Sequence, residues 1–346
     1  MKERVLYADI LRVAATFLVI TIHIVSRDFE LYAIDSYQWQ VLNIYDSFAR
    51  MSVPIFFMLS GIFFLDPNRA FSIKKLYQKN IFRLVTTFIF WSAMYAVFFT
   101  WNEYRTFNAE VWDVIVEAFK EGHFHLWFLF RMIEIYVMIP FLRKIAEEKK
   151  IILYLIAFCW YIGIILPSYY EFPVSSTVTF AERGINLDIT FGYVGYFFAG
   201  YYLAHYNLKK WIKTAIYLLG VAGLISTIVV TSIESLKKGE HYDLPYQYLT
   251  PNVFFMSAAV FLLAKEKLHS KSVSVLFRHI LTEFSTYSFG IYLIHVLLIF
   301  LVWKTGVTTL FMTPILSVPI LTIIIFCISY ICVKGMSKVP LIKRFI

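Results

Sequence analysis

The stretch DILRVAATFLVITIH, residues 9–23, has the apolar character of a membrane-spanning helix, yet it contains Asp9, Arg12 and His23. Ionisable groups at membrane depth are costly, and they occur mainly where they face a protein interior or a water-filled cavity. Arg12 and His23 are 11 residues apart. In an α-helix that spacing is three turns plus roughly 20°, or roughly 16 Å along the axis. One helix face therefore carries both side chains, and Asp9 stands one turn before Arg12, where it can pair with it.

The composition of the whole chain indicates a polytopic membrane protein. Of the 346 residues, 60% are hydrophobic and 16% are charged, whereas about a quarter of the residues of a soluble domain are charged. Repeated apolar runs of about 20 residues predict an all-α fold of about ten transmembrane helices. We expect these spans at residues 8–26, 43–65, 80–101, 124–143, 151–168, 189–207, 211–233, 251–267, 280–303 and 314–335.

The distribution of the basic residues predicts the topology. If the N-terminus is cytoplasmic, the inner loops and ends hold 21 of the 32 lysines and arginines, and the outer loops hold 7. Cytoplasmic loops of membrane proteins are enriched in these residues. We therefore expect both termini in the cytoplasm. The net charge of +9 is then a consequence of topology and gives no reason to expect binding to nucleic acid.

The chain has no visible internal repeat and no low-complexity linker, so we expect a single transmembrane domain over residues 1–346. The three cysteines lie in expected spans and have neither a disulfide framework nor a metal-ligand spacing. The first apolar run does not resemble a cleaved signal peptide, because it contains two charged residues. Among the outer loops, residues 109–121 (AEVWDVIVEAFKE) predict a helix lying on the outer leaflet. The outer loop at 169–188 is either a connector, which its sequence favours, or a cover over a site.

The position of each buried polar residue along its span gives its depth, at 1.5 Å per residue. Two of these residues fall near the cytoplasmic face, Arg12 and Arg83. Others fall in the outer part of the membrane: Arg50, His23, His125 and His295. The pattern predicts one polar cluster at each side of the membrane.

Several of these residues also have a purely structural interpretation. Arg131 and Glu134 stand one turn apart and can simply neutralise each other, and Arg50 can pair with Asp46 in the same way. The long side chain of Arg83 can reach the inner surface, which is its favoured interpretation.

The histidines differ in how easily packing explains them. His125 lies at a membrane boundary beside Trp127, where such side chains commonly anchor a helix. His295 is as well explained by packing as by function. His23 is deep in the membrane and in line with Arg12, which favours a functional role.

Four motifs resemble those of the acyltransferase-3 superfamily of integral membrane proteins. The first is the Arg-x10-His pattern of Arg12 and His23. The second is FARMSVPIFFMLSGIFF (48–64), which is similar to the pattern R-x-x-V-P-x-F-F-x-x-S-G. The third, HLWFL (125–129), resembles the branch that contains polysaccharide O-acetyltransferases, and the fourth, SFGIYLIH (288–295), resembles a late-helix signature. The chain departs from the family in its inner-loop arginine pair, for which Lys79 and Arg83 are the nearest equivalents.

The resemblance implies a membrane O-acyltransferase that moves an acetyl or other short acyl group from cytoplasmic acyl-CoA to a hydroxyl of a cell-surface or lipid-linked glycan. Acetyl-CoA would be a co-substrate, with no permanently bound cofactor and no metal. The partners implied are acyl-CoA, the glycan or lipid-linked sugar acceptor and the lipid bilayer. The expected location is the cell membrane, as a multi-pass protein of a bacterial plasma membrane.

The resemblance also implies roles for individual residues. His23 would be the general base or the nucleophile that accepts the acyl group, and Arg12 would hold the donor, because arginine binds phosphate by paired hydrogen bonds. The residues expected to bind the donor are Asp9, Arg12, Arg83 and Lys79. The residues expected to orient the acceptor or stabilise an oxyanion are Arg50, His125, Glu134, Tyr292 and His295.

Two other functions fit parts of the sequence. A transporter or flippase for a small polar solute or glycan would also have ten spans with buried charges. The sequence shows no matching pair of Gly- or Pro-broken helices, which such transporters commonly contain. A non-catalytic membrane scaffold would not need Arg12 and His23 on one face.

Overall fold

The computed structural model describes residues 5–106, 108–171, 187–268 and 273–346, and in these ranges it contains helices and no strands. Nine helical segments of this described part are long and apolar enough to cross a membrane. The prediction of an all-α polytopic membrane protein is therefore confirmed. The cytoplasmic location of both termini and the single domain over residues 1–346 stay predictions. Most of the outer loop at 169–188 lies outside the described residues.

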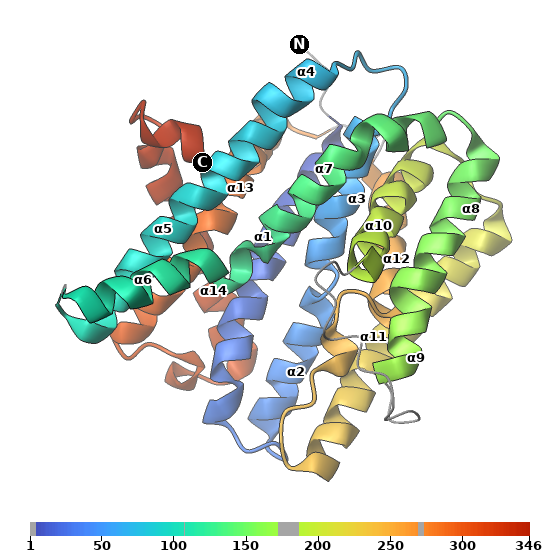
Figure 1. Ribbon diagram of the computed structural model, residues 1–346. Helices are drawn as coiled ribbons and strands as arrows, with labels where there is room; N and C mark the ends of the chain where they lie inside the picture. The colour runs from blue at the N-terminus through green and yellow to red at the C-terminus, as the bar shows by residue number, and fades with distance from the viewer. Residues whose placement is uncertain (1–4, 107, 172–186, 269–272) are drawn as a thin grey trace.

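The long helices pack side by side in a bundle (Figure 1). They are α1 (Leu6–Asp28), α2 (Tyr37–Ala49), α3 (Ser52–Phe64), α5 (Phe82–Tyr104), α6 (Ala109–Glu121), α7 (Trp127–Ile145), α8 (Lys149–Trp160), α10 (Leu187–His205), α11 (Lys210–Lys238), α12 (Pro251–Leu268), α13 (Val275–Lys304) and α14 (Pro314–Met336). The short ones are η1 (Phe29–Leu31), α4 (Ile73–Lys75), η2 (Leu76–Ile81), η3 (Phe124–Leu126), η4 (Tyr161–Ile165), α9 (Leu166–Glu171), η5 (Leu244–Tyr246), η6 (Thr309–Phe311) and η7 (Ile342–Phe345). The sixth expected span, 189–207, corresponds to α10, which is not among the nine segments.

The second expected span, 43–65, is not one continuous helix. The helix ends at Ala49 and begins again at Ser52, so that α2 and α3 are separate helices in Figure 1. The physical reason is Pro54, which has no N–H to donate to the carbonyl of Arg50 and whose ring clashes with that carbonyl in a regular helix. The interruption places Arg50 at the junction of two helices.

The predicted helix at 109–121 is present as α6, which runs across the end of α5 (Figure 1). Asn108 caps its N-terminus by accepting a hydrogen bond from the Val111 N–H, at 2.9 Å. Val111 and Ile115 are buried against α5, while Trp112 is more than half exposed. This amphipathic character suits a helix at a membrane surface, and its position on the outer leaflet stays a prediction.

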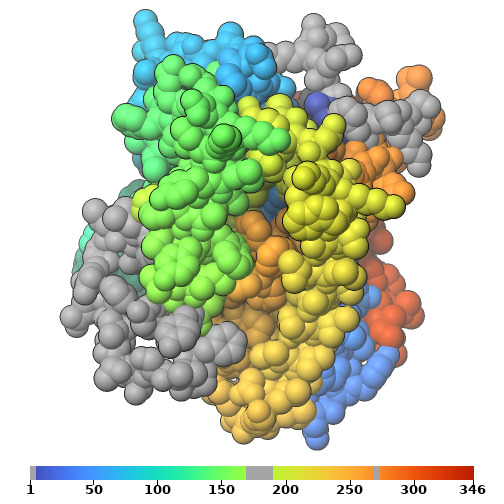
Figure 2. All heavy atoms as spheres, turned by 90° about the vertical axis from the view of Figure 1, so that its right-hand side faces the viewer, coloured from blue at the N-terminus to red at the C-terminus, as the bar shows by residue number. Residues whose placement is uncertain are grey.

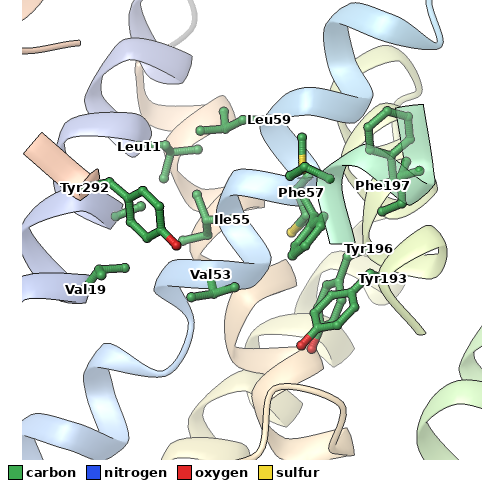
Figure 3. Close-up of a cluster of buried hydrophobic side chains, with 14 of the residues drawn as sticks. Leu11, Val19, Val53, Ile55, Phe57, Leu59, Tyr193, Tyr196, Phe197 and Tyr292 are labelled. Atoms are coloured by element: carbon green, nitrogen blue, oxygen red, sulfur yellow. The ribbon is translucent and has the colours of Figure 1, made fainter. Parts of the chain in front are cut away.

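The centre of the bundle is filled by buried apolar side chains from α1, α3, α10 and α13. Figure 3 shows Leu11 of α1 beside Leu59 of α3, with Ile55 next to Tyr292 of α13. On the other side of α3, the ring of Phe57 stacks on that of Tyr193 in α10, with centroids 4.4 Å apart.

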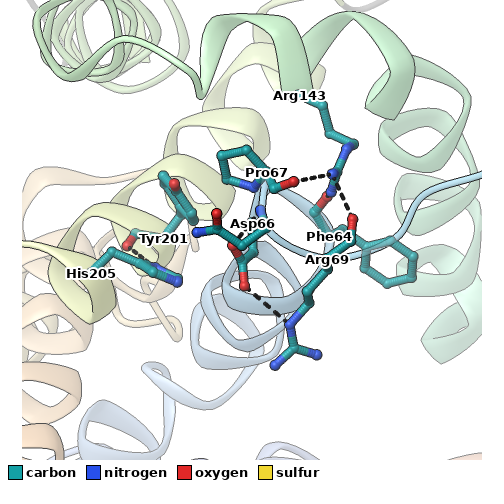
Figure 4. Close-up of polar contacts among 8 residues, drawn as sticks. Phe64, Asp66, Pro67, Arg69, Arg143, Tyr201 and His205 are labelled. Atoms are coloured by element: carbon teal, nitrogen blue, oxygen red, sulfur yellow. Dashed lines mark hydrogen bonds and ion pairs between the residues drawn. The ribbon is translucent and has the colours of Figure 1, made fainter.

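A polar network closes one end of α3. The guanidinium of Arg143, at the end of α7, donates to the main-chain oxygens of Phe64 at 2.8 Å, Arg69 at 3.0 Å and Pro67 at 3.4 Å (Figure 4). Phe64 lies in the last turn of α3, which leaves its C=O group without a helical partner, and Pro67 and Arg69 lie in the segment that follows. Arg143 therefore ties α7 to the segment that follows α3.

Two glycines allow α3 and α10 to approach until their main chains touch. A Cβ atom added to Gly61 would lie 1.9 Å from the carbonyl oxygen of Phe197, and one added to Gly200 would lie 2.2 Å from that of Met58. Both obstacles are main-chain atoms, which cannot turn away as a side chain can. The glycine of the S-G pair in the second motif therefore has a packing role.

We expect Gly61→Ala to lower the free energy of unfolding by at least about 1–3 kcal/mol, because the added methyl group forces the two helices apart. The matched control is Gly335→Ala in α14, where a Cβ would meet no atom within 4 Å. Thermal unfolding of the two variants in the same detergent measures the difference. Equal unfolding midpoints would show that the contact between α3 and α10 is not tight.

Candidate active site

Four histidines from three separate segments lie together. They are His23 of α1, His123 and His125 at η3, and His295 of α13. The ring centroid of His23 is 5.0 Å from that of His295 and 6.4 Å from that of His125. The rings of His125 and His295 are 5.6 Å apart, and those of His123 and His125 are 4.9 Å apart. We call these four residues the histidine cluster. Three of its members are candidate residues from the sequence, and their roles stay predictions.

The hydrogen bonds of the histidine cluster differ from ring to ring. In His125, Nδ1 lies 2.8 Å from Nδ1 of His123, and Nε2 lies 3.4 Å from the Leu293 carbonyl oxygen. In His295, Nδ1 lies 2.6 Å from the carbonyl oxygen of Tyr292. Tyr292 in turn donates its hydroxyl hydrogen to the carbonyl of His125, which ties α13 to η3. His23 is half-buried, and no hydrogen bond of its ring is found within the described residues.

Tyr95 of α5 supports the histidine cluster from one side. Its ring stacks on His123 with centroids 4.3 Å apart and meets His125 edge-on at 5.0 Å. Its hydroxyl donates to the Leu293 carbonyl at 2.8 Å and accepts from the Leu297 N–H at 3.3 Å. Neither Tyr95 nor His123 was a sequence candidate. The repeated histidine in HFH was the available signal for His123, whereas Tyr95 has no distinguishing sequence context.

Arg50 lies near the histidine cluster at the junction of α2 and α3. Its guanidinium pairs with Asp46 at 2.5 Å and stands over the ring of Tyr246, 4.5 Å from the centroid. Its charge is close enough to act on His23. The pairing with Asp46 is the structural alternative that the sequence left open. Nε of Arg50 and Oδ1 of Asp46 are buried and have no partner in the structure, so the pair is not fully satisfied.

His241, between α11 and η5, lies beside the same ion pair. Its ring stacks on Phe29, with centroids 4.3 Å apart. Burial lowers the pKa of His241 below its usual value, although the negative charges of Asp46 and Asp243 oppose the shift. The ring is therefore neutral at pH 7 and adds no charge beside Arg50.

A second polar cluster surrounds Arg12, toward the other end of α1. The Arg12 guanidinium donates to the Ser285 hydroxyl at 3.2 Å and lies 3.6 Å from Oδ1 of Asp9. The Ser285 hydroxyl donates to the same oxygen of Asp9 at 2.5 Å. The Asp9–Arg12 pair predicted from the sequence is thus present, and Ser285 of α13 completes it. The Arg12 side chain remains 31% exposed.

Arg83 of α5 shares this neighbourhood. Its guanidinium donates to the main-chain oxygen of Ile346 at 2.5 Å and lies 5.4 Å from the ring centroid of Phe289. Tyr136 of α7 lies within electrostatic range of both Arg12 and Arg83. The two arginines therefore lie in the same region of the bundle, in agreement with the similar depths expected from their positions along the two spans.

Two further predicted site residues, Glu134 and Lys79, lie in α7 and η2. Glu134 binds Arg131 at 2.8 Å and accepts a hydrogen bond from the hydroxyl of Thr190 at 3.0 Å. These contacts join α7 to α10 and agree with the structural interpretation of the Arg131–Glu134 pair. Lys79 is exposed in η2.

Two described cavities are lined by residues outside both clusters. The larger, of about 160 Å³, is lined by residues such as Ser168, Thr227 and Asn252. These residues belong to α9, α11 and α12. Figure 2 shows the face that α8 and α11 form, with a hollow between the two helices. In the described residues, no group of three or more histidine, cysteine, aspartate or glutamate side chains has an arrangement that could hold a metal ion.

Comparison with known proteins identifies the family. The model of a family described as an acyltransferase domain matches residues 5–334, a range that contains both polar clusters. No curated protein and no solved structure matches the chain. The matched range is nearly the whole chain, and the chain has nine candidate membrane-crossing segments in its described part. The protein therefore belongs to the acyltransferase-3 family and is a multi-pass membrane acyltransferase.

Proposed function

We propose that the protein is an O-acyltransferase that moves an acetyl or other short acyl group from cytoplasmic acyl-CoA to a hydroxyl of a cell-surface or lipid-linked glycan. The observation that carries this proposal is the arrangement of α1, which presents a partly exposed arginine toward one end and the histidine cluster toward the other. We place the protein in the plasma membrane of a bacterium, with the Arg12 end facing the cytoplasm.

The Arg12 end suits the charged part of the donor. Acyl-CoA carries phosphate groups, and a guanidinium binds phosphate by two parallel hydrogen bonds. Arg12 is held in place by Asp9 and Ser285 but keeps an exposed part that can bind an anion. Arg83 would contribute a second guanidinium, and Lys79 would contribute a nearby charge at the membrane surface. The thin pantetheine arm would then extend along α1, over the roughly 16 Å that separates Arg12 from His23.

The histidine cluster suits the transfer itself. In direct transfer, the acceptor oxygen bonds to the acyl carbon, the carbon–sulfur bond breaks, and the hydroxyl proton passes through an imidazole to the CoA thiolate. His23 would be this general base, because an imidazole exchanges protons readily near neutral pH. Alternatively, His23 attacks the thioester, the carbon–sulfur bond breaks, and the thiolate takes the imidazole proton; His23 then carries the acyl group until the acceptor hydroxyl takes it. Arg50, His125 and Tyr292 would orient the acceptor or stabilise the oxyanion.

We expect His23→Ala to abolish acyl transfer, with a loss of at least about 100-fold, because a positioned general base typically contributes 10²–10⁴-fold. The measurement is transfer of label from [14C]acetyl-CoA in proteoliposomes to a total glycan and lipid extract of bacterial membranes. His279→Ala is the matched control, since His279 is exposed in α13. Near-normal activity of the His23→Ala variant, at equal membrane expression, would rule out this mechanism.

We expect Arg12→Ala to raise the KM for acetyl-CoA more than the KM for the acceptor extract, because the arginine would contact only the donor. Arg12→Lys should give a smaller increase, since lysine keeps the charge but not the paired hydrogen bonds. Steady-state kinetics with each substrate varied in turn separates the two constants. Equal changes in both would count against donor binding at Arg12.

One observation favours a transporter as the second candidate. The α2–α3 helix is interrupted in the outer half of its expected span and carries a buried ion pair at the interruption, and discontinuous helices form the substrate sites of many transporters. The same proteoliposomes decide between the two functions. Label found on the glycan favours transfer, whereas movement of unmodified glycan across the bilayer without labelling favours transport.

A further inference from the structure

The structure determines which nitrogen of the His295 ring carries the hydrogen. Nδ1 lies 2.6 Å from the Tyr292 carbonyl oxygen, which can only accept a hydrogen bond, so Nδ1 is the donor. The ring contacts the imidazoles of His23 and His125 and the phenol of Tyr292. It is fully buried and contacts no carboxylate in the described part of the chain, and an unpaired buried charge is costly. The ring is therefore neutral, with its single hydrogen on Nδ1.

It follows that Nε2 of His295 is a free proton acceptor. A neutral imidazole with hydrogen on Nδ1 has a lone pair and no hydrogen on Nε2. This atom is buried and has no hydrogen-bond partner among the residues that the structure describes. Buried polar atoms without a partner are rare in proteins, so each one calls for an explanation. A substrate hydroxyl would supply the missing donor.

His125 and His23, the two histidines that contact His295, lack this combination. His125 has both nitrogens engaged, by His123 and by the Leu293 carbonyl. His23 has no hydrogen bond from the described residues to fix its tautomer or its orientation. A general base works best when one nitrogen is held by an orienting partner and the other is open to the substrate. In His295, the Tyr292 carbonyl holds Nδ1, and Nε2 has no partner among the described residues.

We propose that Nε2 of His295, in place of His23, is the general base that takes the proton from the acceptor hydroxyl, an assignment that rests on the proposed function. The hydroxyl oxygen bonds to the acyl carbon, and its proton moves to Nε2. If the acyl group comes directly from the thioester, the carbon–sulfur bond breaks and the thiolate then takes the proton from His295. If the acyl group comes from His23, the carbon–nitrogen bond breaks instead, and the released His23 nitrogen takes the proton from His295. In both routes His295 returns to its neutral form.

The assignment also changes the expected role of His295. An oxyanion is stabilised by hydrogen-bond donors, and the neutral tautomer in the structure presents a lone pair at Nε2. His295 therefore receives a proton and does not stabilise the oxyanion. His23, whose ring centroid is 5.0 Å from that of His295, then acts on the thioester side of the reaction.

The decisive variant is His295→Asn, because the asparagine amide keeps an N–H donor near the position of Nδ1 but has no base at the position of Nε2. We expect transfer to the glycan extract to fall about 10²–10⁴-fold. Transfer to hydroxylamine, an uncharged nucleophile at neutral pH that needs little help from a base, should fall less than about 10-fold. A merely structural role would lower both rates equally. His295→Gln, which loses the donor to Tyr292, should also lose activity with the glycan extract.

The outcomes separate the inference from the function on which it rests. Active wild-type protein with a fully active His295→Asn variant would overturn the base assignment and leave the acyltransferase proposal standing. Equal losses with both acceptors would overturn the base assignment as well. Wild-type protein that transfers no label to either acceptor would refute the proposed function, and with it the assignment of His295 as the general base.

A measurement independent of activity tests the tautomer. In 15N-histidine-labelled protein, the NMR signal that disappears in the His295→Asn variant should report hydrogen on Nδ1 and none on Nε2. Hydrogen on Nε2 would overturn the inference.

Discussion

The pairing of α1 with α13 is the contact on which the rest of the site depends. Ionisable side chains are costly inside a membrane unless other protein groups meet them. At one end of α1, Ser285 of α13 bridges Asp9 and Arg12; at the other end, His295 of α13 lies against His23. The two helices therefore hold both polar clusters at a fixed separation. A change of tilt between them would disturb donor-side and acceptor-side residues together.

The remaining elements hold this pair in place from several sides. Tyr95 of α5 bonds to Leu293 and Leu297, one turn of α13 apart, and its ring packs on the histidines of η3. Tyr292 bonds back to the main chain of His125, so that α13 and η3 are joined in both directions. Hydrogen bonds among buried groups such as these fix one arrangement, because a lost partner leaves a buried polar atom unsatisfied.

Much of the fold followed from apolar periodicity and length, because a membrane leaves the chain few alternatives to the helix. The helix at 109–121 was also predictable from its alternating faces. The interruption at Arg50 was not predicted, although Pro54 supplied the local signal. The continuous apolar run around Pro54 fits a single span, and this pattern favoured an uninterrupted helix.

The meeting of Arg12 with Asp9, and the grouping of three histidines apart from Arg12, could be predicted because helix geometry and direction of travel convert sequence position into depth. The contacts that Tyr95, Ser285 and Ile346 make could not be predicted from the sequence. Each depends on a contact between residues far apart in the chain, and periodicity within one helix contains no information on such contacts. The same limit applies to the tautomer of His295, since a single main-chain carbonyl determines it.

The direct contact of main chains at Gly61 and Gly200 has a consequence for how the bundle can move. At Gly61 and Gly200 no side chains lie between the two backbones to rearrange, so α3 and α10 move together at this contact. Motions that widen the helix bundle must therefore occur at other helix–helix interfaces, where side chains can change rotamer while the backbones separate.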